Sequence, residues 1–252
     1  MPAQGERRLQ QALRDLVSAL GATGVPWMII GGIAVIARGV RRFTGDIDAA
    51  IRGDEIDVKT LITALAKKQI VPRIGHAEQF ARESLVLLLR HEPSGVQFDV
   101  SFVWTDFEQE AIAAASIVSF GAVKAPMAQP EDLIVFKAIA GRGKDIDDAT
   151  ALLSLYPEID LARLRARVHQ LAALAETPDL GAGLETAIVA AAEARRAVPG
   201  AAKGPKLTPT QRVRTSRATR GRTTAKPRAP TKPRAPTKPR APTKLARKRS
   251  KK

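Results

Sequence analysis

The chain has 252 residues and a formal net charge of +16, because 41 Lys and Arg stand against 25 Asp and Glu. It has no cysteine and three scattered histidines, which excludes a disulfide scaffold, a thiol nucleophile and a cysteine- or histidine-rich metal centre. No apolar run reaches the roughly 18 residues that a membrane span needs. The charged N-terminus also lacks the apolar core of a secretory signal. We therefore expect a soluble, cytoplasmic protein with no membrane partner.

The basic excess is confined to the last fifth of the chain. Residues 203–252 hold 19 Lys or Arg and no acidic residue, and the motif KPRAPT occurs three times over 226–243. This composition cannot bury enough apolar surface to offset chain entropy, so we predict a disordered tail over 199–252. Its charge predicts salt-dependent, sequence-independent binding of nucleic acid through 203–252. A solubilising low-complexity extension is the competing interpretation.

The residues before the tail alternate between helical and strand patterns. In chain order, the first expected elements are a helix over 9–20, a strand over 26–30, a helix over 33–39, a strand over 46–51 and a helix over 54–69. A hairpin of strands 85–91 and 96–103 follows, then a helix over 106–115 and one or two edge strands within 117–125. From Pro130 the pattern is helical, near 131–141, 144–155, 160–175 and 180–196. This order predicts an α+β core over 1–127 and a helical domain over 128–198.

Four residues near the start of the chain form a motif that can carry chemistry. Gly31 and Gly32 stand at a strand-to-helix junction, where glycines let the backbone approach a phosphate and free N–H groups face an anion. Asp46 and Asp48 lie two apart on a strand, so their carboxylates share one face. Such a pair repels itself without a cation and offers the oxygen ligands that Mg²⁺ prefers.

A third carboxylate comes from the later hairpin. Asp99 lies on the face of its strand opposite Phe98, Val100 and Phe102, and it joins the other two aspartates if the two strands are neighbours. Three carboxylates with bound Mg²⁺, and glycines near a helix start, are suited to transferring a nucleotide from an NTP.

The order of these motifs resembles the polymerase-β-like nucleotidyltransferase fold: a glycine pair, a spacer, an Asp-x-Asp motif and an aspartate on a later strand. More narrowly, Arg42-x-Thr44-x-Asp46-Ile47-Asp48 and the segment PEDLIVFKAIAGRGKDIDDATAL (130–152) resemble the AbiEii-type nucleotidyltransferases, the toxins of type IV toxin–antitoxin systems. The resemblance covers about residues 25–155. It implies a mixed sheet flanked by helices and followed by a helical bundle. It also implies Mg²⁺-dependent transfer from an NTP to RNA or protein, and an antitoxin encoded as a separate protein.

Motif and resemblance together give the expected site. Asp46, Asp48 and Asp99 would bind Mg²⁺ and carry catalysis, with Asp99, or a metal-bound oxygen near it, helping to deprotonate the acceptor. The nucleotide would be held by Gly31, Gly32, Arg42, Thr44, Lys137 and Asp145. In the wider superfamily a serine often follows the first glycine, so Gly32 leaves backbone N–H groups to hold the phosphate alone. The long basic tail is a second departure from the pattern.

Two alternatives from other classes stay open. One is a catalytically inactive nucleotidyltransferase fold that senses a nucleotide or binds a protein or nucleic acid. The other is a chromatin- or RNA-associated protein whose front domain is only a scaffold.

Overall fold

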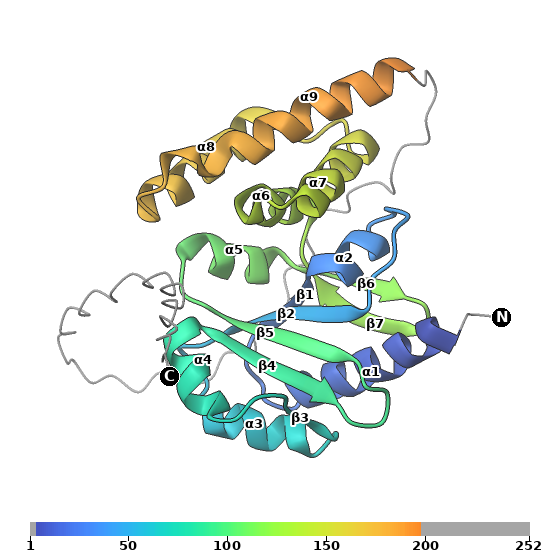
Figure 1. Ribbon diagram of the computed structural model, residues 1–252, viewed down its shortest axis with the longest axis vertical. Helices are drawn as coiled ribbons and strands as arrows, with labels where there is room; N and C mark the ends of the chain where they lie inside the picture. Colours follow the sequence, from blue (N-terminus) through green and yellow to red (C-terminus); the bar gives the residue numbers. More distant parts are fainter. Residues whose placement is uncertain (1–3, 198–252) are drawn as a thin grey trace, which may run out of the picture. The chain divides into compact units, whose positions relative to one another are not determined.

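The computed structural model describes residues 4–197, and within them a seven-stranded mixed sheet has helices on both faces (Figure 1). The strand order is β3-β4-β5-β2-β1-β7-β6. The strands are β1 (Trp27–Ile30), β2 (Asp46–Arg52), β3 (Ile70–Pro72), β4 (Val86–His91), β5 (Gln97–Val103), β6 (Ser116–Phe120) and β7 (Val123–Met127). This architecture confirms the predicted α+β class, with a mixed sheet in the first part of the chain and helices after it.

Strand β2 lies at the centre of the sheet and positions the aspartate pair. It pairs antiparallel with β1 and parallel with β5. Along β2, Ile47, Ala49 and Ile51 are fully buried, whereas Asp46 is exposed and Asp48 half-buried. The alternation of a two-residue period therefore turns the apolar side chains into the core and both carboxylates to the other face.

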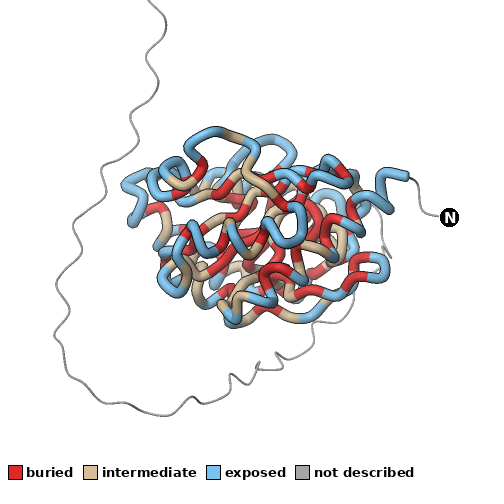
Figure 2. Tube along the Cα trace, turned by 90° about the horizontal axis from the view of Figure 1, so that it is seen from below, coloured by how far each residue is buried: buried red, intermediate tan, exposed pale blue. Residues whose placement is uncertain are grey.

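Helices cover both faces of the sheet. Helices α1 (Gln4–Gly21) and α3 (Val58–Ala66) lie on one face, below the sheet in Figure 1. In α1, Leu9, Leu13, Leu16 and Leu20 recur at helical spacing and are 6% exposed or less. Helices α2 (Gly31–Ala37) and α5 (Asp106–Ala114) lie on the other face. Buried and exposed stretches alternate along the chain accordingly (Figure 2).

The second part of the described chain is helical, as predicted. Its helices are α6 (Pro130–Ala140), α7 (Gly143–Leu155), α8 (Leu161–Leu174) and α9 (Ala182–Ala197), with a short 3₁₀ turn over Pro178–Gly181. The buried Tyr156 hydroxyl donates a hydrogen bond of 2.8 Å to the backbone carbonyl of Arg38, which ties the end of α7 to the end of α2. All described residues belong to one compact unit, and the boundary at residue 127 stays a prediction.

Two elements were not predicted, and one helix begins later than expected. Strand β3 has three residues, too few for a period-2 pattern. Helix α4 (Ala77–Ser84) buries only two alanines, Ala77 and Ala81, so it carries no run of large apolar side chains. Helix α3 begins at Val58 rather than near residue 54, because the Asp57 side chain accepts a hydrogen bond of 3.1 Å from the Thr60 N–H and caps the helix there.

Among residues 4–197, no helix combines the length and apolarity that crossing a membrane requires. The predicted disordered tail over 199–252, with its expected binding of nucleic acid, lies outside the described residues.

Candidate active site

The sheet brings the three predicted carboxylates together. Asp48 and Asp99 are register partners on the parallel strands β2 and β5, and Asp46 lies opposite Gln97 two residues earlier. Register partners on neighbouring strands share a face, so the expected convergence is confirmed. Burial raises the pKa of Asp48 above its ordinary value, and the nearby carboxylates of Asp46 and Asp99 raise it further. Negative charge at the centre of the cluster is therefore only partly compensated.

Each carboxylate has its own local partner. Arg73 donates a hydrogen bond of 2.6 Å to Asp99 and one of 2.8 Å to the side-chain oxygen of Gln97. The Thr44 hydroxyl donates to Asp46 over 2.6 Å. The backbone N–H of Gly32 acts on Asp48 by lowering the pKa of its carboxyl, against the larger effect of burial. Sequence reasoning missed Arg73, because it lies in the connection after the unpredicted β3 and no motif marks it.

The chemistry of the donor set fits a hard divalent cation. All three side chains are carboxylates on one face of the sheet, and the pKa of Asp48 is raised by burial and then by the neighbouring carboxylates, whose repulsion a cation would relieve. In residues 4–197, no group of three or more His, Cys, Asp or Glu side chains already has the spacing of a metal centre.

The glycine pair is required sterically as well as for any phosphate contact. A Cβ atom on Gly31, whose φ is +61°, would lie 1.8 Å from Oδ2 of Asp48. A Cβ atom on Gly32 would lie 2.6 Å from the Thr44 hydroxyl oxygen. Thr44 thus places a hydroxyl beside Gly32, where the sequence alone predicts only backbone N–H groups to hold the phosphate.

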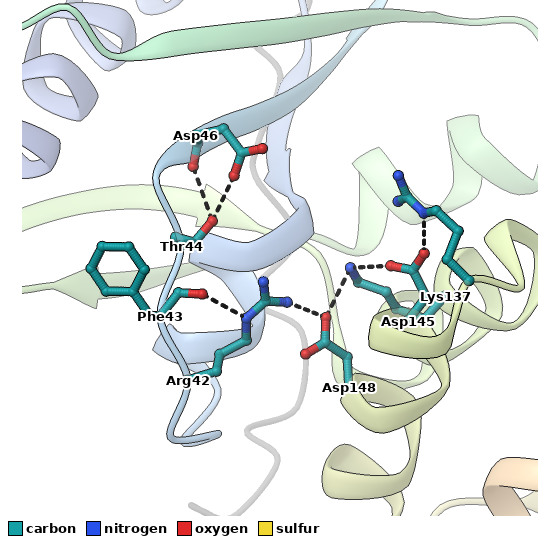
Figure 3. Close-up of polar contacts among 8 residues, drawn as sticks. Arg42, Phe43, Thr44, Asp46, Lys137, Asp145 and Asp148 are labelled. Atoms are coloured by element: carbon teal, nitrogen blue, oxygen red, sulfur yellow. Dashed lines mark hydrogen bonds and ion pairs between the residues drawn. The ribbon is translucent and has the colours of Figure 1, made fainter.

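A cluster of ion pairs lies beside the carboxylates, between the loop before β2 and helices α6 and α7 (Figure 3). The Lys137 ammonium lies 2.8 Å from Oδ1 of Asp145 and 2.9 Å from Oδ2 of Asp148. Asp148 also pairs with Arg42, and Asp145 with Arg142. Burial raises the pKa of Asp145, but the hydrogen bonds from Arg142 and Lys137 outweigh it and leave that pKa below its ordinary value.

The cluster places the remaining predicted residues. Lys137 is 7% exposed and Asp145 is fully buried, so Asp145 pairs with the Lys137 ammonium from the protein interior. Asp148, which was not among the predicted site residues, bridges Lys137 and Arg42. Its position one helical turn after Asp145 was the available signal, since such spacing puts both acids on one face of α7.

A cavity of about 430 Å³ opens next to Asp46. Its lining residues are Arg42, Phe43, Thr44, Gly45, Asp46, Gly95, Gln97 and Lys144. A larger cavity of about 780 Å³ lies at the other ends of β2 and β5, and no predicted site residue lines it. The smaller cavity is the one that borders the carboxylate cluster, through Asp46.

The family follows from a match that spans the sheet and most of the helical part. The model of the family described as "Nucleotidyl transferase of unknown function (DUF2204)" matches residues 9–177. The chain belongs to this family. As a DUF2204 nucleotidyl transferase it is an enzyme, which confirms the predicted superfamily and enzyme class. The narrower AbiEii-type resemblance stays a prediction.

Solved structures similar to this DUF2204 member are distant. ANT(2'')-Ia, an antibiotic-resistance factor, is 18% identical with a TM-score of 0.47, covering 67% of this chain and 95% of that one. A nucleotidyltransferase-like protein from Paracoccidioides brasiliensis is 21% identical with a TM-score of 0.42, covering 70% and 92%. JHP933 from Helicobacter pylori is 14% identical with a TM-score of 0.44, covering 78% and 92%. A comparison with curated proteins finds no match.

Proposed function

We propose that this DUF2204 member is a Mg²⁺-dependent nucleotidyltransferase that transfers a nucleotide from an NTP to a macromolecular acceptor, RNA or protein. The observation that carries the proposal is the in-register placement of Asp48 and Asp99, with Asp46 on the same face. Three carboxylates from two central strands, with Asp46 at the edge of an open cavity, suit nucleotidyl transfer better than a purely structural role.

Asp46, Asp48 and Asp99 are the residues that would hold Mg²⁺. When bound, the cation would offset the charge of the triphosphate and make the acceptor hydroxyl more acidic. Asp99 would accept the acceptor's proton, and its side chain, 44% exposed, is reachable from solvent. Arg73, bonded to Asp99, orients that carboxylate.

The nucleotide would be held by the cations beside the carboxylates. Lys137 and Arg42 are both fixed by Asp148, so they can meet a triphosphate without losing much side-chain freedom. We infer that Asp145 acts through Lys137 rather than on the nucleotide directly, since it is fully buried. Gly31 and Gly32 would let the backbone approach the phosphates, and Thr44 would supply a hydroxyl.

The toxin role belongs to the same proposal and rests on the AbiEii-type resemblance. An antitoxin would then be a separate protein, and a neighbouring gene for a small DNA-binding protein would support it. The catalytically inactive alternative predicts a degraded site. Intact carboxylates and the fixed Lys137 favour the active enzyme.

The test is transfer of label by the full chain. Each α-³²P-labelled NTP is incubated with Mg²⁺ and total cellular RNA and protein, and label on a macromolecule is measured. We expect label from wild type, none from Asp48→Asn, and wild-type label from Asp54→Asn. Asp54 is the matched control, because it is an exposed acid just beyond the far end of β2. Label that survives in Asp48→Asn would refute the assignment of the site.

Nucleic-acid binding through 203–252 is a second part of the proposal, supported by the 19 Lys and Arg of that segment. Each phosphate contact contributes about −0.9 to the slope of log K against log salt concentration on duplex DNA. Removal of 203–252 should therefore flatten that slope by several units. An unchanged slope would show that the tail is an extension without this role.

A further inference from the structure

Phe43 stands out on the surface of the molecule. It is 81% exposed, more than any other large apolar side chain in residues 4–197. A single exposed apolar residue needs no explanation by itself. Phe43, however, lines the 430 Å³ cavity together with Asp46, which places the exposed ring beside the proposed reaction centre.

The backbone on either side of the ring is fixed. Before it, Arg42 is held by its ion pair with Asp148, and its Nε donates a hydrogen bond of 3.2 Å to the Phe43 carbonyl. After it, Thr44 is 5% exposed and bonded to Asp46. In Figure 3 the ring points away from these anchors. An anchored loop therefore presents an aromatic surface that contributes nothing to the core.

The rest of the cavity wall is polar and holds two cations and one acid. Arg42 and Lys144 carry positive charge, Gln97 supplies an amide, and Asp46 is the one acid. Arg73 contacts Gln97 and adds a third cation at this end of the sheet. An aromatic ring with neighbouring cations and an amide matches a nucleotide, whose base stacks on a ring and whose phosphate needs a cation. It does not match a polycationic acceptor.

We propose that this cavity binds the nucleobase of the acceptor's terminal nucleotide, with Phe43 as the stacking residue, so that the acceptor is RNA rather than protein. This inference rests on the proposed function. Of the residues that would hold the NTP, Arg42 and Thr44 line the cavity but Gly31, Gly32 and Lys137 do not. The base is assigned to the acceptor because Gln97 also lines the cavity and shares the Arg73 side chain with Asp99, the residue that would take the acceptor's proton.

Gly45 offers a way to fill the cavity without disturbing the protein. It lines the cavity, its φ is not in the left-handed region, and a Cβ atom there would meet no atom within 4 Å. Gly45→Val therefore inserts a side chain into open space. The matched control is Gly21→Val, whose Cβ is equally open but lies at the end of α1, outside the cavity.

The first measurement is steady-state transfer by the full chain to a single-stranded RNA 12-mer. Stacking of one base on an aromatic residue predicts a rise of roughly 10- to 100-fold in the KM for RNA in Phe43→Ala. The same rise is expected in Gly45→Val, with the KM for NTP unchanged in both. Phe43→Tyr should restore the wild-type KM, and Gly21→Val and Trp104→Ala should match wild type. An equal rise in the KM for NTP, or label on protein only, would overturn the assignment.

The second measurement does not depend on transfer. The 12-mer carries 5-iodouracil at its 3′ terminus, and near-ultraviolet light links this base to an aromatic side chain stacked on it. We expect the cross-link on the peptide that holds Phe43, in wild type and in the inactive Asp48→Asn alike, and its loss in Gly45→Val. A link to that peptide from 5-iodo-UTP but not from RNA would assign the cavity to the NTP and refute our proposal. Cross-linking to Phe43 with no transfer in wild type would instead refute the proposed function while still supporting the base site.

Discussion

A Cβ atom on Gly31 would lie 1.8 Å from Oδ2 of Asp48, so only a glycine at this position leaves space for the carboxylate. The same glycine directly follows β1 and begins α2, with a backbone φ of +61° that residues with a side chain rarely adopt. Strand β1 pairs with β2 so that Ile30 faces Asp48, which fixes this contact through the sheet itself. The glycine therefore protects the position of the central carboxylate whether or not a phosphate is bound.

Gly31→Ala should impair the enzyme more than it impairs the fold. A left-handed backbone costs a non-glycine residue about 1–3 kcal/mol, and the added methyl group must displace Asp48. We expect a loss of that size in the free energy of unfolding and at least a ~100-fold fall in nucleotidyl transfer. Denaturant unfolding and the label-transfer assay measure the two effects. Gly21→Ala, at an open helix end, is the control, and near-wild-type transfer in Gly31→Ala would remove the steric argument.

Asp48→Asn should raise the stability of the protein and abolish its activity. Burial and the neighbouring carboxylates raise the pKa of Asp48, so its charge opposes folding at neutral pH. The neutral amide should raise the free energy of unfolding by about 1 kcal/mol, while transfer is lost because a cation ligand is gone. Asp54→Asn should change neither by more than about 0.5 kcal/mol or twofold. A destabilised Asp48→Asn would mean that the carboxylate is a structural acceptor for the Gly32 N–H.

The local elements of this fold were accessible from the sequence because their patterns are strong. The alternation in β2 and β5 and the leucine spacing in α1 each report a buried face directly. Strand β3 and helix α4 left no such pattern, since one is three residues long and the other buries only alanines. The sequence could place Asp99 beside Asp48 only on the condition that their strands pair. That pairing joins residues some fifty positions apart, and no local rule decides it.

Within the site, residue types were easier to predict than their partners. Asp46, Asp48 and Asp99 stand out because acids inside apolar strands need a reason. Arg73 acts through contacts made by distant segments, so its importance becomes visible only in three dimensions. For Asp148 the spacing from Asp145 was visible in the sequence, but its pairing with Arg42 was not. Asp145 shows the converse, because its motif suggested contact with the nucleotide and the structure buries it behind Lys137.

Lys137→Met should destabilise the protein strongly. Lys137 is 7% exposed and pairs with two buried acids, and removing one member of a buried ion pair costs about 3–5 kcal/mol. Because Arg142 and Arg42 still hold Asp145 and Asp148, we expect the lower end, about 3 kcal/mol. Denaturant unfolding of Lys137→Met and of Lys124→Met, an exposed lysine on β7, makes the comparison. A loss below about 1 kcal/mol would show that the two arginines neutralise the acids alone, leaving Lys137 free for the nucleotide.

Asp132, in the first turn of α6, should make stability depend on pH. Burial raises its pKa to about 6 from 3.8, and only part of this is offset by Arg167. The folded state therefore favours the neutral acid, so the contribution of Asp132 to stability is greatest below about pH 4 and is lost as pH rises through the interval from about 4 to about 6. Above that interval the buried charge costs up to about 3 kcal/mol.

Asp132→Asn removes that cost without changing the shape of the side chain. The variant should be more stable than wild type at pH 7.5, by up to about 3 kcal/mol, and nearly equal to it at pH 4. Urea unfolding at several pH values measures the difference between the two proteins, in which the titration of all other groups cancels. Asp106→Asn, an exposed acid in the first turn of α5, reports what the helix terminus alone gains from a carboxylate. If the difference between Asp132→Asn and wild type stays constant from pH 4 to 7.5, then Asp132 keeps its charge when buried, and Arg167 compensates it fully.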